Sequence, residues 1–424
     1  MRFLPLPSTI ILTFFVTALP RAIPAAEAAA PMKNIWTCDE LTPDLCSLEV
    51  EEGSLVVKGG LLVHYWRYRR AGDASPDPNK LPVLMLHGGP GFPHNYMLPL
   101  KQQACRGREV IFYDQAGCGA SSLPTGKLVE DDYPWLLDPS YYAEEELPSV
   151  VSHLGLERYH ILGSSWGTML AQLYALNANP GDGLASLVLS GPLSDAQAYI
   201  EAQWDEENGS LGSLPPFVQS RIKSLEESGG YASAEYAAIN TVLTTFFTVR
   251  TAPAPDCFDD SLRGVNADVY VGMQGPSEFT MGGTLGNYST TDRLGEIVVP
   301  VLLTSGAYDT MRPDIVQTMK DGLPRAEWFY LRRSAHCSMV DEPGPMNNAV
   351  ADFLERVEEE EATEKRGHLG SSFVPKSWEP RLDNESVPHT SFWSVAWVLL
   401  AFAIGTIVGR RMGGHSRRCE YELV

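Results

Sequence analysis

A serine suited to nucleophilic catalysis lies between a predicted strand and a predicted helix. Ser165 is the central residue of Gly163-Ser164-Ser165-Trp166-Gly167, which follows the apolar run 159–162 and precedes an Ala- and Leu-rich helical pattern over 168–177. In a nucleophile elbow, the flanking glycines permit a sharp turn, and the helix N-terminus faces the negative charge that develops during acyl transfer. The pattern alone is common by chance, but its strand-turn-helix context predicts that Ser165 is a nucleophile.

A base and a group to orient it follow in the order that this chemistry requires. Asp309 comes after the predicted strand 299–304, and His336 comes after the predicted strand 326–330. Taken singly, Asp309 is typical of a loop turn and His336 of a surface histidine. Together they follow the chain order Ser, Asp, His of α/β-hydrolases. This order predicts a triad in which Asp309 orients His336 and His336 takes the proton of Ser165.

An oxyanion site requires two backbone donors near the nucleophile. The predicted strand 83–86 runs into His87-Gly88-Gly89-Pro90-Gly91, whose glycines allow the backbone to approach a substrate closely. The N–H groups of Gly89 and Trp166 are the predicted donors. The alternative is that residues 87–91 form only a tight turn, but the order of the motifs along the chain favours the oxyanion site.

Strands and helices alternate along most of the chain, which indicates an α/β fold with a mostly parallel sheet and helices on both faces. Between 192 and 290, helical patterns at 216–227 and 234–249 replace the strand signal. We therefore expect an α/β-hydrolase fold whose core, 27–191 and 291–357, contains an inserted helical cap, 192–290. The predicted strands are 61–68, 83–86, 109–113, 159–162, 184–189, 299–304 and 326–330.

Both ends of the chain have the character of membrane-targeting segments. Residues 1–26 resemble a signal peptide, with Arg2 before an apolar stretch and small residues near the end. The uncharged segment 392–408 precedes Arg410 and Arg411, which predicts a transmembrane helix after a stalk, 358–391, and before a cytoplasmic tail, 409–424. The alternatives are an uncleaved N-terminal anchor and a C-terminal helix that packs on protein. This topology predicts a single-pass protein of the secretory pathway with a lumenal or extracellular catalytic domain.

An oxidising compartment would permit disulfides and glycosylation. Cys38 and Cys46 are close in sequence and form the most plausible local bridge, while the other cysteines cannot be paired from sequence. The sequons at Asn208, Asn287 and Asn384 are possible glycosylation sites.

The overall composition excludes some classes of partner. The 424 residues include 53 acidic and 32 basic side chains, a net charge of −21, so the surface is not built to neutralise phosphates and nucleic acid is not an expected partner. No metal-ligand spacing, phosphate-binding loop or dinucleotide fingerprint occurs in the sequence. We therefore expect no metal and no cofactor.

Five short segments carry a resemblance to a known family. They are His87-Gly-Gly-Pro-Gly91, Asp114-Gln-Ala-Gly-Cys-Gly119, Gly163-Ser-Ser-Trp-Gly167, Gly275-Pro-Ser-Glu-Phe-Thr280 and Gly306-Ala-Tyr-Asp309. Together they resemble the proline iminopeptidase family of α/β-hydrolases, including the tricorn-interacting aminopeptidases, over about residues 50–357. The resemblance implies the triad and the oxyanion donors named above. It also implies that Glu278 binds the free amino terminus of a short peptide, for which a carboxylate is suited.

Two positions depart from the family pattern. Thr310 occupies the place of a second acidic residue in the tricorn-associated members, and Ala116 occupies the place of a usual arginine. The first departure predicts a weaker hold on the substrate's amino group.

The predicted activity is that of a serine hydrolase that releases N-terminal residues, proline among them, from short peptides through an acyl-enzyme. One alternative is an amidase or esterase that acts on amino-acid amides, esters or a small metabolite. The other is a catalytically idle binding protein with a hydrolase fold.

Overall fold

An eight-stranded sheet forms the centre of the protein. The computed structural model describes residues 37–42, 46–72, 77, 79–178 and 181–367. The strand order is β1-β2-β4-β3-β5-β6-β7-β8, in which β1, β2 and β4 pair antiparallel and the remaining pairs are parallel. The strands are β1 (Leu48–Val56), β2 (Leu62–Arg70), β3 (Val83–Leu86), β4 (Val110–Tyr113), β5 (Tyr159–Ser164), β6 (Leu184–Ser190), β7 (Val301–Gly306) and β8 (Ala326–Leu331).

The predicted mostly parallel α/β sheet is confirmed, and seven of its strands lie where the sequence pattern places them. The pattern does not predict β1, in which Glu49 to Glu52 are all exposed. Among the described residues this strand lies at the edge of the sheet and pairs with β2 alone. A strand that buries so little has no apolar alternation by which it can be recognised.

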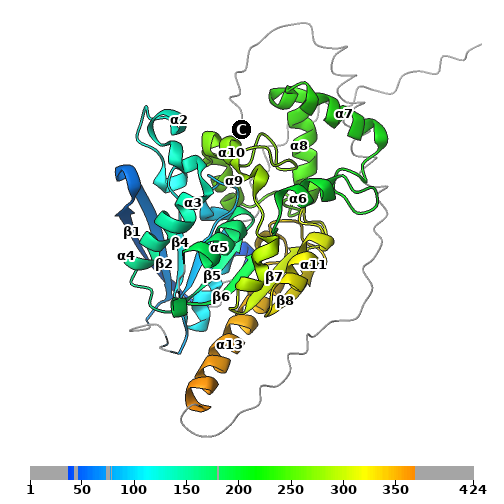
Figure 1. The fold of residues 1–424 in the computed structure, drawn as a ribbon. Helices are drawn as coiled ribbons and strands as arrows, with labels where there is room; N and C mark the ends of the chain where they lie inside the picture. The colour runs from blue at the N-terminus through cyan, green and yellow to red at the C-terminus, as the bar shows by residue number, and fades with distance from the viewer. Residues whose placement is uncertain (1–36, 43–45, 73–76, 78, 179–180, 368–424) are drawn as a thin grey trace, which may run out of the picture.

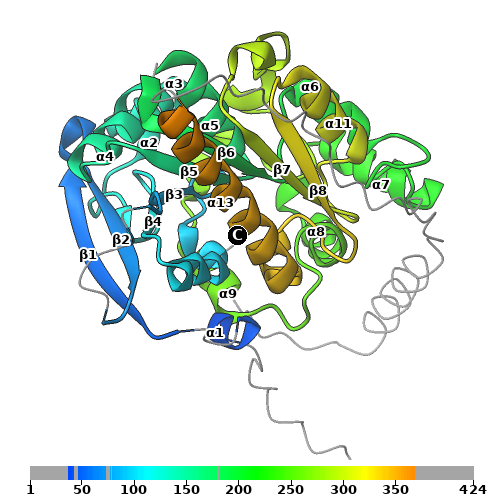
Figure 2. The same cartoon turned by 90° about the horizontal axis from the view of Figure 1, so that it is seen from below.

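Helices cover both faces of the sheet, as Figures 1 and 2 show. Within the described residues the α-helices are α1 (Cys38–Leu41), α2 (Val129–Asp132), α3 (Pro139–Tyr141), α4 (Leu147–His153), α5 (Trp166–Asn177), α6 (Ala196–Gln203), α7 (Pro216–Glu227), α8 (Ala234–Phe247), α9 (Asp256–Arg263), α10 (Ala267–Met273), α11 (Pro313–Gly322), α12 (Ser338–Asp341) and α13 (Pro343–Gly367).

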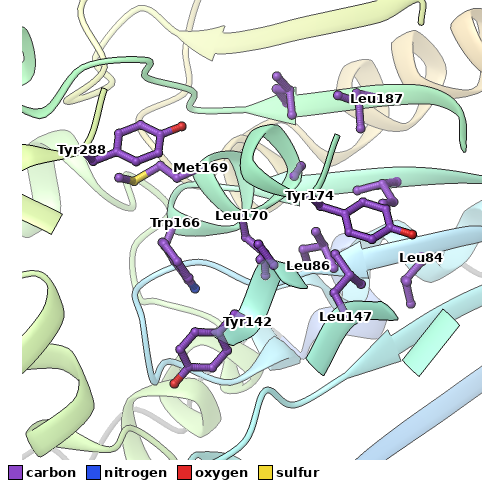
Figure 3. Packing of buried hydrophobic residues seen from close by; sticks show 14 of the residues in the cluster. Leu84, Leu86, Tyr142, Leu147, Trp166, Met169, Leu170, Tyr174, Leu187 and Tyr288 are labelled. Atoms are coloured by element: carbon purple, nitrogen blue, oxygen red, sulfur yellow. The ribbon is translucent and has the colours of Figure 1, made fainter. Parts of the chain in front are cut away.

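Each face of the sheet has its own apolar cluster. Leu84 and Leu86 of β3 are fully buried in a cluster that includes residues of α4, α5 and α11. Figure 3 shows this cluster, with Leu86 among the side chains of α5. Val83 and Met85 point to the other face, where residues of α13 and of the 3₁₀ segment η2 (His94–Arg106) cover them. Burial on both faces explains why the central strands are continuously apolar rather than alternating.

The segment between β6 and β7 contains five helices, α6 to α10, which gather at one end of the sheet (Figure 1). Helices α7 and α8 share a small apolar cluster of their own, which includes Leu225, Leu243 and Phe279. Helix α9 instead packs on η2, where the backbone N–H of Tyr96 donates to Ser261 Oγ at 2.9 Å. The inserted segment therefore has one part with its own core and one part held against the sheet domain.

The predicted Cys38–Cys46 bridge is wrong. The structure pairs Cys38 with Cys257 and Cys46 with Cys105. Helix α1 lies against α9, and the Cys38 N–H donates to Asp256 Oδ1 at 2.9 Å. Cys46 instead leads into β1 and reaches the end of η2, so nearness in sequence did not decide the pairing. Cys118 and Cys337 are buried free thiols, and Cys419 lies outside the described residues.

The predicted membrane-anchored localisation requires correction. None of the helices in the described ranges combines the length and the apolar character needed to cross a membrane. The predicted signal peptide 1–26, transmembrane helix 392–408 and tail 409–424 lie outside those ranges. Residues 358–367, expected in the stalk, continue α13 instead. Asn208 and Asn287 are exposed, but exposure alone does not establish glycosylation, and Asn384 lies outside the described residues.

A buried ion pair fastens α13 to the sheet domain. Glu358 Oε1 accepts from Arg108 Nη1 at 2.8 Å, and His160 Nε2 of β5 lies 3.4 Å from the same oxygen. Burial raises the pKa of Glu358, but the hydrogen bonds from His160 and Arg108 lower it more, to about 2. This depressed pKa stabilises the fold above the ordinary glutamate pKa, and the contribution is lost as the pH falls toward 2.

We predict that Glu358→Gln lowers the free energy of unfolding at pH 7 by about 3–5 kcal/mol, because Arg108 is left buried without its counter-charge. The variant should also lose less stability than the parent between pH 5 and pH 3. Chemical denaturation across this range measures both effects. The control is Glu360→Gln in the same helix, whose pair with Arg325 is exposed, with an expected cost of about 0–1 kcal/mol. Equal losses in the two variants would contradict the role of the buried pair.

Candidate active site

Ser165 occupies a strained turn between β5 and α5. Strand β5 ends at Ser164, α5 begins at Trp166, and Ser165 between them has φ 54° and ψ −122°. Among the described residues it is the only non-glycine residue with a positive φ. Such a conformation costs about 1–3 kcal/mol and persists only where the surrounding structure enforces it. The predicted elbow is thus present as a backbone feature.

The glycines around Ser165 are required by close backbone contacts. A Cβ atom on Gly163 would lie 2.3 Å from the carbonyl oxygen of Gly167, and one on Gly167 would lie 2.1 Å from the carbonyl oxygen of Leu86. A Cβ atom on Gly88 would lie 2.7 Å from Cβ of Ser165. The elbow and the loop after β3 therefore pack backbone to backbone, at distances that no larger residue permits.

Asp309 and His336 form a hydrogen-bonded pair. His336 Nδ1 lies 2.7 Å from Asp309 Oδ1, and both side chains are buried. Asp309 Oδ1 also accepts from the Met311 N–H at 2.9 Å, which fixes the carboxylate in the loop after β7. The second ring nitrogen, Nε2, is buried and has no hydrogen-bond partner within the described part of the chain. It is therefore available for a proton transfer.

A single loop connects this pair to Ser165. The Ser165 N–H donates to the carbonyl oxygen of Ser190 at 2.9 Å. The next residue, Gly191, has φ +60°, and a Cβ atom there would lie 2.7 Å from Cε1 of His336. The end of β6 thus contacts the elbow on one side and the imidazole on the other. The three predicted triad residues are brought together at the carboxyl edge of the sheet.

The charge around His336 favours its protonated form. Burial lowers the pKa of His336, but the Asp309 carboxylate, its hydrogen bond to the ring and the more distant Glu278 together raise it above the ordinary value of 6.5. Glu278 is thus a carboxylate of the inserted segment whose charge reaches the imidazole.

The predicted oxyanion donors lie at the start of α5 and on the loop after β3. Trp166 is the first residue of α5, so its N–H has no partner inside the helix. Gly89 has φ +34°, and the preceding Gly88 N–H donates to the Tyr96 hydroxyl at 2.8 Å. Tyr96 therefore holds the loop on which Gly89 lies. The sequence analysis did not identify Tyr96, because it is buried in η2 and resembles an ordinary core residue.

Gln115 connects the start of α5 to the loop after β3 through its side chain. Its Oε1 accepts from the Trp166 indole N–H at 2.8 Å, and its Nε2 donates to the carbonyl oxygen of His87 at 3.2 Å. Its backbone N–H donates to His87 Nε2 at 2.9 Å. Gln115 is part of the segment 114–119 that carried the resemblance, but the sequence assigned it no role.

Glu278 lies on the side of the site formed by the inserted segment. One carboxylate oxygen accepts from the Tyr270 hydroxyl at 2.6 Å, and the Tyr199 hydroxyl donates to the Glu278 backbone carbonyl. The ring of Tyr270 approaches Gly89, since a Cβ atom on that glycine would lie 3.4 Å from Cε2 of Tyr270. No ion pair joins Glu278 to a basic side chain in the described ranges. Tyr270 thus places an uncompensated carboxylate close to the oxyanion loop.

The two departures from the family pattern are both buried. Thr310 is fully buried, and its hydroxyl lies 3.5 Å from Asp309 Oδ1. Ala116 donates its N–H to Glu146 Oε2 at 3.2 Å, and burial raises the pKa of Glu146 to about 8. Sequence patterns gave no indication of Glu146, which belongs to the π-helical segment η5 (Tyr142–Glu146).

One group of potential metal ligands occurs among the described residues, and two of its three members are joined by a disulfide. In the part of the chain that the structure describes, Cys38, Asp256 and Cys257 are the one group with three ligand atoms within 4.8 Å of one another. Both sulfur atoms belong to the Cys38–Cys257 disulfide, so they offer no thiolate.

Comparison with known proteins identifies the family. Residues 82–228 match the model of the α/β hydrolase fold. Proline iminopeptidase of Lactobacillus delbrueckii subsp. bulgaricus is 36% identical over 282 residues, which are 65% of this chain and 90% of that protein. The enzyme of Lactobacillus helveticus is 33% identical over 314 residues, 74% of this chain and 100% of its own length. The crystal structure of proline iminopeptidase from Mycobacterium smegmatis, 31% identical, superposes with a TM-score of 0.62 over 73% of this chain and 100% of that one. The chain belongs to the proline iminopeptidase family of α/β-hydrolases and is a serine hydrolase.

Proposed function

We propose that this enzyme removes the N-terminal residue from short peptides, proline among the residues accepted. The observation that carries the proposal is the Glu278 carboxylate, which accepts a hydrogen bond from Tyr270 beside the oxyanion loop and helps to raise the pKa of His336. The names of the relatives, all proline iminopeptidases, support the same substrate class.

In this proposal Ser165 and His336 carry out the chemistry of acylation. Ser165 Oγ attacks the carbonyl carbon of the first residue while His336 Nε2 takes the hydroxyl proton. Asp309 holds Nδ1–H and stabilises the imidazolium that forms. The N–H groups of Gly89 and Trp166 bind the oxyanion. His336 then gives its proton to the leaving nitrogen, which releases the shortened peptide and leaves the first residue as an ester on Ser165.

Deacylation uses the same groups with water as the nucleophile. His336 takes a proton from water, the resulting hydroxide attacks the ester, and the second oxyanion forms at the same donors. Return of the proton to Ser165 Oγ frees the amino acid and restores the enzyme.

Glu278 explains why cleavage would stop at the first residue. The amino terminus of a peptide is largely protonated at neutral pH, and a partly buried carboxylate without a counter-ion attracts that charge. Because Tyr270 contacts both Glu278 and the oxyanion loop, the separation between the ammonium site and the reacting carbonyl is fixed. A site of this kind selects substrates whose ammonium and reactive carbonyl belong to the same residue.

The first test is removal of the nucleophile. Ser165→Ala should fold like the parent but lose peptidase activity by about 10⁴- to 10⁶-fold, because no acyl-enzyme can form. It should also lose labelling by a fluorophosphonate. Ser210→Ala is the control, because this buried hydroxyl in the inserted segment has no hydrogen-bond partner among the described residues, and it should keep both properties. Activity of the Ser165 variant within tenfold of the parent would rule out the assignment.

The second test concerns the substrate ammonium. Glu278→Gln should lower kcat/KM for aminoacyl arylamides by about 10- to 150-fold, which corresponds to the free energy of one charge-assisted hydrogen bond. The variant should leave kcat/KM unchanged for N-acylated and simple ester substrates. Glu226→Gln is a matched control, because Glu226 also accepts from a tyrosine hydroxyl of the inserted segment, that of Tyr236, at 2.8 Å. Equal losses on charged and uncharged substrates would favour a general amidase or esterase.

The third test uses the titration of His336. This histidine must be neutral to accept the Ser165 proton, so kcat/KM falls as the pH drops through its pKa. Glu278 contributes to the raised pKa of His336. Glu278→Gln should therefore move the acid midpoint to lower pH, measured with an ester that carries no amino group. An unchanged or higher midpoint would contradict the proposed proximity of Glu278 to the base, and Glu226→Gln should leave the midpoint in place.

A further inference from the structure

The loop that carries His336 is held by the inserted segment as well as by the sheet domain. This loop, 332–337, connects β8 to α12. The His336 N–H donates to the carbonyl oxygen of Phe247 at 3.1 Å, and the Cys337 N–H donates to that of Thr248 at 2.8 Å. Phe247 is the last residue of α8. The backbone of the proposed base therefore pairs directly with the end of a helix from the inserted segment.

One carboxylate strengthens this connection from both sides. Asp341 Oδ1 accepts from the backbone N–H groups of Arg250 at 2.9 Å and Thr251 at 2.8 Å, and from the Thr251 hydroxyl at 2.9 Å. The other oxygen, Oδ2, accepts from the Ala335 N–H at 2.8 Å. Asp341 thus makes three hydrogen bonds to the inserted segment and one to the residue before His336.

The adjacent acid, Glu342, provides a contrast. Its Oε2 accepts from the Arg333 N–H and from the Ser334 hydroxyl, each at 2.8 Å. Both partners belong to the same loop, and none of the hydrogen bonds that the structure shows for Glu342 reaches the inserted segment. Two consecutive carboxylates therefore hold one loop, but only Asp341 also holds the segment that contributes Glu278.

We propose that Asp341 is a positioning residue that couples the inserted helical segment to His336. Asp309 fixes the orientation of the imidazole through Nδ1, but it does not fix the backbone from which the ring projects. That backbone is placed by residues 247–251. Asp341 binds both these residues and Ala335, and so fixes the distance between them. The inference rests on the proposed role of His336 as the base.

The proposal is tested by comparing Asp341→Ala, Asp341→Asn and Glu342→Ala in the full-length protein. Each variant is measured for melting temperature, kcat, KM and the rate of labelling by a fluorophosphonate. Asp341→Ala should lower kcat by about 10- to 100-fold, the effect of a displacement near 1 Å at a reacting group. The labelling rate should fall in proportion, because labelling needs only Ser165 and its base.

The other two variants distinguish positioning from simple loop support. Asp341→Asn retains one acceptor oxygen, so it loses the hydrogen bonds either to the inserted segment or to Ala335. It should therefore show a smaller loss in kcat and in the labelling rate. Glu342→Ala removes two hydrogen bonds from the loop and should lower the melting temperature while leaving kcat and labelling close to the parent. If Asp341→Ala does not fold, the Asp341→Asn variant decides.

Two results would overturn the inference. One is parental kcat and labelling in folded Asp341 variants, and the other is a loss in Glu342→Ala as large as that in Asp341→Ala. Failure of the proposed function would look different, because the parent enzyme itself would then resist labelling or cleave substrates without regard to their amino group.

Discussion

Backbone packed against backbone at the nucleophile elbow is the constraint on which the rest of the site depends. Gly163 lies against Gly167, Gly167 lies against Leu86, and Gly88 lies against Ser165, each too close for a side chain. These contacts hold Ser165 at a positive φ that costs about 1–3 kcal/mol. The same contacts bring the loop after β3, with Gly89, to the start of α5, so the nucleophile and both predicted oxyanion donors are placed by one packing arrangement.

Polar side chains then fix the loops that this packing brings together. His87, Gln115 and Trp166 form a buried hydrogen-bonded chain that joins the loops after β3 and β4 to the start of α5. Figure 3 shows that the Trp166 ring also belongs to the apolar cluster beneath, where it meets Tyr142 at 5.8 Å between ring centroids. The ring of Trp166 thus lies in the core, while its backbone N–H lies at the site. Because every member of such a network is satisfied internally, it favours a single arrangement of the loops.

The inserted segment completes the site from two directions. On one side, the Asn266 N–H donates to the carbonyl oxygen of Gly91 and its side chain donates to that of Gly117, so the start of α10 is joined to both core loops. Helix α10 carries Tyr270 and thereby the position of Glu278. On the other side, Asp341 joins the end of α8 to the His336 loop. These hydrogen bonds add to an apolar contact between the inserted segment and the sheet domain, in which Val269 and Met273 of α10 belong to the cluster of Leu86.

The sequence by itself determined the elements whose signals are local. Apolar runs marked seven strands, glycines around Ser165 marked the elbow, and the residues after two later strands marked Asp309 and His336. These features depend on backbone conformation and burial over a few consecutive residues. Only the tertiary structure decided the Cys38–Cys257 and Cys46–Cys105 pairs, the exposed edge strand β1, and the contacts of Tyr96, Gln115 and Asp341. The physical reason is that contacts between residues 59, 91 or 219 positions apart in the sequence depend on how the intervening elements pack, and no local pattern records that.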